Sequence, residues 1–160
     1  MLKYLARRLL YSFRKDAVTI DALDNKQRNE ESDMGNIKAV FVGTGMIGAG
    51  LAANAMLNGY QTVLYDVVPH EKMRQNISHI LDILVGAGAA TREQADAALN
   101  ACHFSNDLED AVKGANFVQE CIPERLELKK STYATIQKVT GPDAIICSST
   151  SKLFPTKLQE

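Results

Sequence analysis

Three glycines at a fixed spacing are the residues of this sequence with the clearest chemical potential. Gly43, Gly45 and Gly48 stand between an apolar run, Lys38 to Val42, and a helical pattern that begins near Met46. In that setting the first glycine permits a tight turn, the second lets a diphosphate approach the backbone, and the third allows close helix–strand packing. The amides and the dipole of the helix start would then face the phosphates. We therefore predict a dinucleotide phosphate site formed by Gly43, Thr44, Gly45, Met46, Ile47 and Gly48.

An acidic residue lies about 20 positions further along, where a dinucleotide site needs one. Asp66 ends the next apolar run, Gln61 to Asp66. A carboxylate there accepts hydrogen bonds from the adenosine ribose hydroxyls, whereas the 2′-phosphate of NADP would meet a like charge. The glycines and Asp66 together favour NAD(H) as the cofactor. Folds that bind FAD carry the same glycine pattern, so FAD stays an alternative at this point.

Short apolar runs alternate with helical patterns beyond residue 35, which is typical of a parallel sheet joined by helical crossovers. Thr91, followed by Glu93 and Asp96, indicates a helix start, and Gly86 and Gly88 end the helix before it. The pattern predicts an α/β fold, a Rossmann-type doubly wound parallel sheet with a helical pair inserted after the second strand. The expected strands are residues 38–42, 61–66, 116–120 and 144–148 with a short one at 103–105, and the expected helices are residues 46–58, 70–85, 91–100 and 125–139.

Composition narrows the classes of partner. The 160 residues are 46% hydrophobic and 23% charged, which suits one soluble domain or one domain with an appendage. A net charge of −1 gives no field that would gather nucleic acid, and no apolar run approaches the roughly 20 residues of a membrane span. The odd number of cysteines, without metal-ligand spacing, indicates reduced thiols and no metal site. We expect Cys102, Cys121 and Cys147 to serve as small buried apolar residues.

Residues 1–35 differ in composition from the rest. Met1 to Lys15 holds basic residues and no acid, and the polar stretch from Asp16 to Asp33 resembles a linker. We expect an amphipathic helix and linker in residues 1–35 and an NAD-binding domain in residues 36–160. A translation start at Met34, a targeting or membrane-surface helix, and a helix docked on the domain all stay open. The protein is expected in the cytoplasm, or in the mitochondrial matrix if residues 1–15 act as a presequence.

Three motifs in order resemble a known family. They are "VFVGTGMIGAGLAANAMLNGYQTVLYD", "NFVQECIPERLELKK" and "AIICSSTSKLFPTKLQ". From Ile37 to Glu160 the chain is similar to the N-terminal domain of the L-3-hydroxyacyl-CoA dehydrogenases. The second and third motifs resemble more closely one branch of the superfamily, which contains L-carnitine dehydrogenase and lambda-crystallin. Lambda-crystallin is also known as L-gulonate 3-dehydrogenase.

The resemblance implies roles for individual positions. Glu124 and Lys129 match family positions that contact NAD near its nicotinamide end. Ser151 matches the serine that bonds near the reacting hydroxyl and the nicotinamide ribose. The sequence also departs from the family: Asp82 and Ala89 occupy positions where the fatty-acyl enzymes contact CoA with a hydroxyl and a lysine, which makes a CoA carrier doubtful. Ser149 stands where the usual loop has asparagine, as in the carnitine and gulonate branch.

The general base of the family is missing from this sequence. In the family it is a histidine on a strand that would follow Glu160, and a helical C-terminal domain closes the cleft and forms a homodimer. We expect structural or solvated roles for His70, His79 and His103. The resemblance implies an oxidoreductase that oxidises the 3-hydroxyl of a small hydroxy acid by hydride transfer to NAD⁺, and we expect residues 1–160 alone to bind NAD with negligible turnover. A non-catalytic dinucleotide-binding module, crystallin-like or regulatory, is the alternative.

Overall fold

Five parallel strands form one sheet in the computed structural model, which describes residues 36–159. Their order is β3-β2-β1-β4-β5, so the chain leaves the sheet after β3 and returns on the other side of β1. Val42 pairs in register with both Tyr65 and Glu120, and Glu120 pairs with Ser148, so the carboxyl ends of four strands share one edge. The strands are β1 (Lys38–Val42), β2 (Gln61–Tyr65), β3 (His103–Ser105), β4 (Phe117–Glu120) and β5 (Ile145–Ser148).

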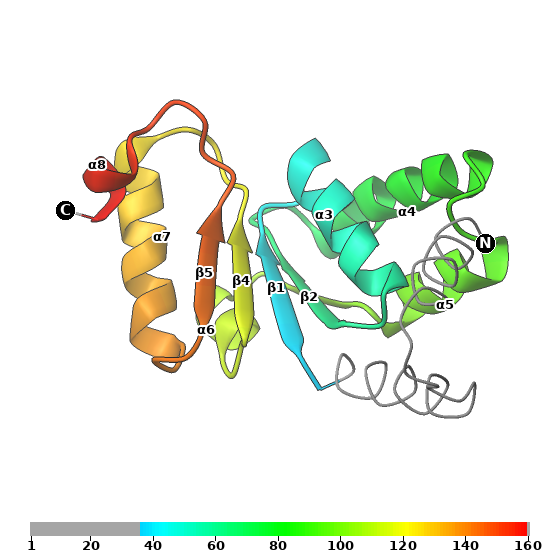
Figure 1. The fold of residues 1–160 in the computed structure, drawn as a ribbon, viewed down its shortest axis with the longest axis horizontal. Coiled ribbons are helices and arrows are strands. Elements are labelled where there is room, and N and C mark those ends of the chain that lie inside the picture. The colour runs from blue at the N-terminus through cyan, green and yellow to red at the C-terminus, as the bar shows by residue number, and fades with distance from the viewer. Residues whose placement is uncertain (1–35, 160) are drawn as a thin grey trace, which may run out of the picture. The chain divides into compact units, whose positions relative to one another are not determined.

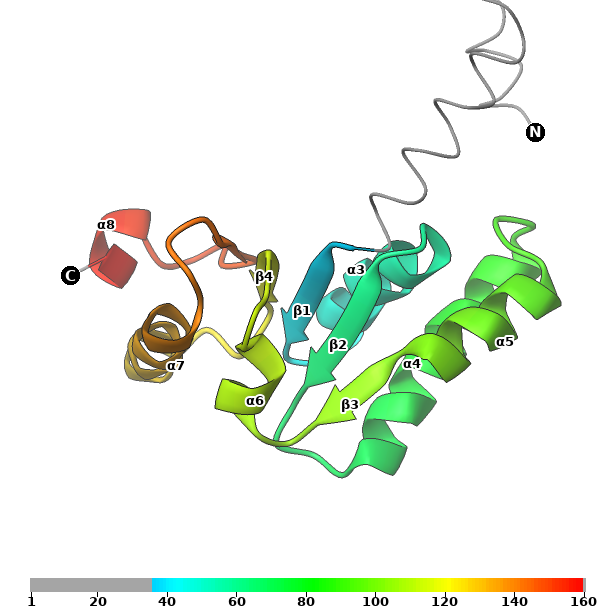
Figure 2. The ribbon, with the colours of Figure 1, turned by 90° about the horizontal axis from the view of Figure 1, so that it is seen from below.

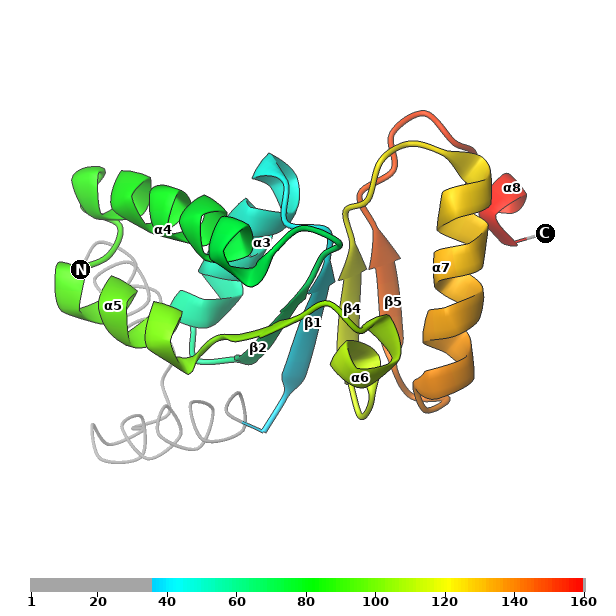
Figure 3. The same cartoon turned by 180° about the vertical axis from the view of Figure 1, so that it is seen from behind.

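Helices cover both faces of the sheet, which confirms the doubly wound prediction. The first three helices pack on one face of β1 and β2, and α6 and α7 pack on the other face (Figures 1 and 3). The short helices α6 and α8 were not predicted, while the other helices lie within two residues of the expected bounds. The helices are α3 (Met46–Leu57), α4 (His70–Gly86), α5 (Arg92–Ala101), α6 (Leu108–Val112), α7 (Leu126–Val139) and α8 (Pro155–Gln159).

The central strand β1 is buried on both faces because its side chains alternate between two cores. Ala39 and Phe41 pack with α3, α4 and α5, whereas Val40 and Val42 pack with α6 and α7. A strand covered on both sides must be apolar at every position, which explains the unbroken run that identified it in the sequence. Figure 2 shows β1 between β2 and β4, with the α3 side and the α7 side on opposite sides of the sheet.

The predicted helical pair after the second strand is α4 and α5, joined by a capped turn. Gly88 adopts a φ of +70°, and its amide and that of Ala89 close the end of α4 on the carbonyls of Val85 and Leu84. The Thr91 hydroxyl accepts the Gln94 amide, and the Gln94 side chain accepts the Thr91 amide. The helix start predicted at Thr91 is therefore confirmed, with Gln94 as the reciprocal partner.

The predictions for residues 1–35 lie outside the described residues. The boundary between this segment and the NAD-binding domain stays a prediction. In the part of the chain from residue 36 to residue 159, no helix combines the length and the hydropathy that a membrane crossing requires.

Two glycines allow close packing around the turn after β1, Gly48 between the turn and α3 and Gly43 between the turn and the residue that follows β4. Gly43 has a φ of +99°, and a Cβ on it would lie 2.8 Å from the Cys121 carbonyl oxygen. A Cβ on Gly48 would lie 1.9 Å from the Gly43 carbonyl oxygen, closer than any real contact. Both positions therefore exclude a side chain, one by backbone conformation and crowding and the other by crowding alone.

We expect Gly48→Ala to destabilise the domain, because the methyl group would force α3 away from β1. Overpacking typically costs about 1–3 kcal/mol, and a backbone neighbour, which cannot rotate away, places this change at the upper end. Gly50→Ala is the matched control, because Gly50 lies in the same helix and a Cβ on it would meet nothing within 4 Å. That change should raise stability by up to about 1 kcal/mol. Urea unfolding of both variants measures the difference, and equal stabilities would contradict the packing argument.

Candidate functional site

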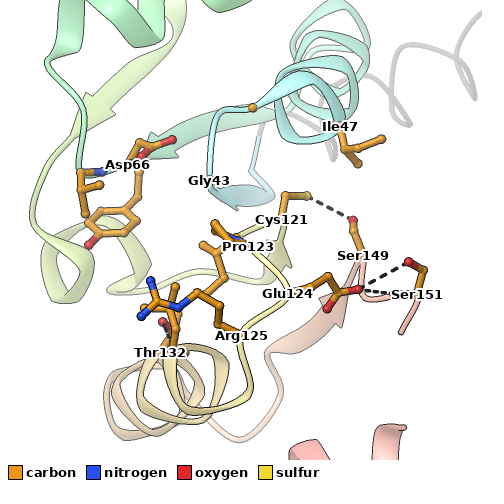
Figure 4. Close-up of a pocket in the computed structure, with 15 residues that line it drawn as sticks. Gly43, Ile47, Asp66, Cys121, Pro123, Glu124, Arg125, Thr132, Ser149 and Ser151 are labelled. Carbon is orange, nitrogen blue, oxygen red and sulfur yellow. Dashed lines mark hydrogen bonds between the residues drawn. The ribbon is translucent and has the colours of Figure 1, made fainter. Parts of the chain in front are cut away.

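A pocket of about 780 Å³ opens at the carboxyl edge of the sheet, at the point where the strand order reverses. Its size lies in the range of ordinary ligand sites. Side chains from the glycine turn, the end of β2, the β4–α7 loop and the β5–α8 loop face into it (Figure 4). The lining residues are Gly43, Gly45, Ile47, Tyr65, Asp66, Val67, Cys121, Ile122, Pro123, Glu124, Arg125, Leu128, Thr132, Ser149 and Ser151.

The glycine turn presents an uncapped helix start to this pocket. Gly45 is the N-cap of α3, and no side chain bonds to the amides of the first turn there. These amides have no acceptor within the helix, so they can donate to an anion. The turn itself is held from two sides. The Gly43 backbone amide donates to the Tyr65 carbonyl at 2.8 Å, and the side-chain amide of Asn76 donates to the Thr44 carbonyl at 2.9 Å.

Asp66 is fixed at the end of β2 by bonds from the same turn. Its Oδ2 accepts the Thr44 amide at 2.6 Å and the Thr44 hydroxyl at 2.7 Å, and its Oδ1 accepts the Val67 amide at 2.7 Å. The Asn106 side chain donates to the carbonyls of Asp66 and Val68. The carboxylate is therefore held in one place on the pocket wall, while its remaining lone pairs can accept from a ligand.

A buried carboxylate, that of Glu120, supports the β4–α7 loop on the pocket wall, and the exposed fraction of Glu120 is 0%. Its Oε1 accepts the Ile122 amide at 2.7 Å and the Lys129 ammonium at 2.6 Å. Its Oε2 accepts the Tyr133 hydroxyl at 2.5 Å and the Ser148 hydroxyl at 2.6 Å. Burial and the bond to Glu120 raise the pKa of Tyr133, so its hydroxyl keeps its proton and donates. The carboxylate thus has four donors, as a buried charge requires.

Glu124 connects the β4–α7 loop to the loop after β5. Its carboxylate accepts the Thr150 hydroxyl at 2.7 Å, the Ser151 amide at 2.6 Å and the Lys152 amide at 3.2 Å. These bonds, that from Thr150 first, lower the pKa of Glu124 to about 2. Figure 4 shows the Glu124 carboxylate turned toward Ser151 at one end of the pocket.

The structure brings together most of the ten residues predicted for the site. Six of the ten line the pocket: Gly43, Gly45, Ile47, Asp66, Glu124 and Ser151. The other four do not. Thr44 is buried and holds Asp66, Gly48 is buried against Gly43, and Met46 is 82% exposed. Lys129 is 1% exposed, with its ammonium group bonded beneath the pocket wall, so its direct contact with the cofactor stays a prediction.

The remaining candidates lie away from the pocket or on its edge. All three histidines fall within the described residues, and none is among those that line the pocket. Asp82 makes an ion pair with Arg92 at 2.8 Å, and Ala89 lies in the turn between α4 and α5. Cys102, Cys121 and Cys147 are free thiols, and burial raises the pKa of Cys102 to about 12. Cys121 is half-buried and lines the pocket, where its sulfur lies 3.2 Å from the Ser149 hydroxyl.

Sequence reasoning missed Glu120, Tyr133 and Asn76. The sequence did contain a signal for Glu120. It lies two residues after the apolar Val118 in the same strand, so both side chains point to the same face and toward the same core. Tyr133 lies four residues beyond Lys129 on the face of α7 that also buries Ile136. Asn76 supports the glycine turn from α4, a contact across 32 positions that local patterns do not reveal.

Comparison with known proteins identifies the family. A profile described as the NAD binding domain of 3-hydroxyacyl-CoA dehydrogenase matches residues 38–160. The match covers most of the chain, and the chain therefore belongs to this family of NAD-binding domains. NAD is the cofactor, and the alternative of FAD left open by the glycine pattern falls away.

Individual relatives agree with the family match. L-carnitine dehydrogenase from a Pseudomonas species is 37% identical over 121 residues, which are 74% of this chain and 36% of that protein. The 5-formyl-3-hydroxy-2-methylpyridine 4-carboxylate 5-dehydrogenase of Mesorhizobium japonicum is 38% identical, over 74% of this chain and 38% of its own. The structure of 3-hydroxybutyryl-CoA dehydrogenase from Escherichia coli superposes with a TM-score of 0.68 at 29% identity, over 76% of this chain and 26% of that chain. The chain thus spans between a quarter and two fifths of the length of these proteins.

The low pKa of Glu124 is open to direct measurement. A carboxyl whose pKa is depressed stabilises the fold above its ordinary value near 4.3, and this contribution is lost as the pH falls through the lowered value. We expect the carboxyl ¹³C shift of Glu124 to show the ionised form at pH 3 still, because its pKa is about 2. Thr150→Val removes the largest cause and should raise the midpoint. A midpoint near pH 4 in the unaltered protein would contradict the assignment.

Proposed function

We propose that these residues form the NAD-binding part of an oxidoreductase that oxidises the 3-hydroxyl of a hydroxy acid, of the 3-hydroxyacyl-CoA, L-carnitine or L-gulonate type. The single observation that carries the proposal is one pocket at the reversal of strand order, lined by the glycine turn, Asp66, Glu124 and Ser151. In doubly wound sheets a dinucleotide lies across this crevice. The uncapped start of α3 suits the diphosphate and Asp66 suits the adenosine ribose.

The geometry supports one direction for the dinucleotide. Asp66 places the adenosine half over β2, where Val67 and Leu128 offer apolar walls for the adenine ring. The diphosphate would lie on the amides from Gly43 to Gly48, with Thr44, Met46 and Ile47 contributing backbone. The nicotinamide half then extends over β4 and β5, toward Glu124, Ser149 and Ser151. Arg125 is the cation of the pocket lining and can offset the charge of the diphosphate.

The chain's own groups supply only part of the reaction. Bound NAD⁺ would supply the hydride acceptor. Oxidation of a secondary alcohol also needs a base for the hydroxyl proton, a step worth about 10²–10⁴-fold. Ser151 offers a hydroxyl near the proposed nicotinamide end, but no histidine lines the pocket in the described part of the chain. We infer that residues 1–160 bind NAD with negligible turnover, and that the base belongs to a larger protein.

The relatives leave the substrate open. One is named for L-carnitine and another for a hydroxylated pyridine carboxylate, although they are 37% and 38% identical to this chain over 121 residues. We infer a small hydroxy acid as the substrate class, without a nucleic-acid partner, and a homodimer for the larger protein. The free cysteines suit a reducing compartment, and we infer the cytoplasm, with the mitochondrial matrix as the alternative if residues 1–15 act as a presequence. Membrane contact by residues 1–15 stays a separate hypothesis.

A non-catalytic dinucleotide-binding module is the second candidate. The uncapped start of α3 and the fixed carboxylate of Asp66 suffice for it, because binding a dinucleotide needs no base. The two candidates differ in the larger protein, since only an oxidoreductase reduces NAD⁺ when a 3-hydroxy acid is added.

Gly45→Val tests the cofactor site directly. The isopropyl group would occupy the space of the diphosphate, so NADH binding should be lost. Folding should persist, because a Cβ at Gly45 meets nothing within 4 Å. Enhancement of NADH fluorescence measures binding to the unaltered chain, to this variant and to Gly50→Ala, a helix glycine that does not line the pocket. NADH affinity in Gly45→Val equal to that of Gly50→Ala would refute the proposed diphosphate site.

Cofactor choice provides a second test. The carboxylate of Asp66 is fixed by three hydrogen bonds and cannot swing away from a 2′-phosphate. A carboxylate placed against a phosphate costs several kcal/mol of binding free energy. NADH should therefore bind at least about tenfold more tightly than NADPH. Asp66→Asn removes the charge and should narrow this ratio. Fluorescence titration with the two reduced cofactors gives it, and equal affinities in the unaltered chain would remove Asp66 from its role.

A further inference from the structure

We propose that Glu120 and Lys129 are positioning residues for the nicotinamide half of the pocket, and that they act on it through Glu124. This inference rests on the proposed function, because it assigns the half of the pocket over β4 and β5 to nicotinamide. Neither residue is among the pocket residues, and their exposed fractions are 0% and 1%. Their contribution is therefore made from beneath the wall.

The first step runs from the sheet to the β4–α7 loop. Lys129 reaches back from α7 and donates to Glu120 Oε1 at 2.6 Å and to the Ile122 carbonyl at 3.2 Å. Glu120 accepts the Ile122 amide in return. Both polar groups of Ile122 are thus bound by one buried ion pair, which fixes the backbone that leads to Glu124.

The second step runs from that loop to the loop after β5. The Lys129 ammonium lies 3.7 Å from Glu124 Oε2 and so faces both carboxylates. Glu124 in turn binds the Thr150 hydroxyl and the amides of Ser151 and Lys152. Glu120 also holds this loop at its base, through the Ser148 hydroxyl and through its own carbonyl, which accepts the Ser149 amide. The Lys129 ammonium therefore binds the end of β4 and the β4–α7 loop directly, and the loop after β5 through the two carboxylates.

Replacing Lys129 by an apolar residue should disturb this part of the structure, because it leaves two carboxylates without their shared cation. Two carboxylates share one ammonium group, and without it they repel each other across a short distance. Glu124 is partly exposed and can move into solvent, whereas Glu120 cannot. Loss of the cation should therefore release Glu124 and the loop at Ser151. The glycine turn and Asp66 depend on bonds from Thr44, Tyr65 and Asn76 instead, and should stay in place.

The test compares two ligands and three variants of the 160-residue chain by calorimetry. ADP reads the adenosine half alone, and NADH reads both halves. Lys129→Met removes the cation, and Glu120→Gln combined with Lys129→Met removes both buried charges so that the domain can fold without an unpaired one. Lys138→Met removes a cation that is 74% exposed on the same helix and is the matched control.

We expect both Lys129 variants to lose at least about tenfold in NADH affinity, the size of one charge-assisted contact, with ADP affinity unchanged within about twofold. Lys138→Met should alter neither. Hydrogen exchange of the Ser151 amide should quicken in Lys129→Met while that of the Thr44 amide does not. A folded double variant with unaltered NADH affinity, or equal losses for NADH and ADP, would overturn the inference. If the unaltered chain binds neither ligand, the proposed function fails and this inference fails with it.

Discussion

Glu120 places a carboxylate where no solvent reaches it, and the structure around the pocket is arranged to meet that constraint. Breaking a buried ion pair from one side costs about 3–5 kcal/mol, because the remaining charge has no partner. Four donors from the β4–α7 loop, α7 and β5 converge on this one group. The position of α7 relative to the sheet, and the path of the loop between β4 and α7, both follow from the need to deliver those donors.

Two acidic residues stand at the carboxyl ends of β2 and β4, the strands on either side of β1, and their carboxylates have different roles. Asp66 follows β2 and accepts three bonds from nearby backbone and from Thr44, but it stays on the pocket wall and can accept more. Glu120 ends β4 and is fully used inside the protein. The difference follows from what packs on each side chain, since Asp66 faces the pocket and Glu120 is covered by Lys129 and Tyr133. Both sides of this edge thus line the pocket, the β2 side with a carboxylate that can bind a ligand and the β4 side with a loop that a buried ion pair supports.

Local patterns predicted the strands, the glycine turn and the acid after β2, and they did not predict the buried ion pair beneath the β4–α7 loop. The glycines, Asp66 and the five strands were found because strand period, turn chemistry and helix start are encoded by adjacent residues. Lys129 was singled out by resemblance, as a cofactor contact, and its burial was not foreseen. Its spacing from Thr132 and Ile136 places all three on the inner face of α7, which could have indicated burial. The burial of a charge depends on a partner elsewhere in the chain, and no local pattern supplies that partner.

The same contrast bears on how one domain serves proteins named for different substrates. The proposed diphosphate site depends on contacts between α3, α4, β1 and β2, and it would bind its ligand through backbone amides more than through side chains. The loop at Ser151 depends on Glu124, 27 positions away, and on the ion pair behind it. Changes in that loop can therefore adjust the nicotinamide end without disturbing the diphosphate end, while substrate choice can be added by residues outside this domain. A cofactor site divided in this way would hold the diphosphate through backbone amides and place the nicotinamide end through side chains.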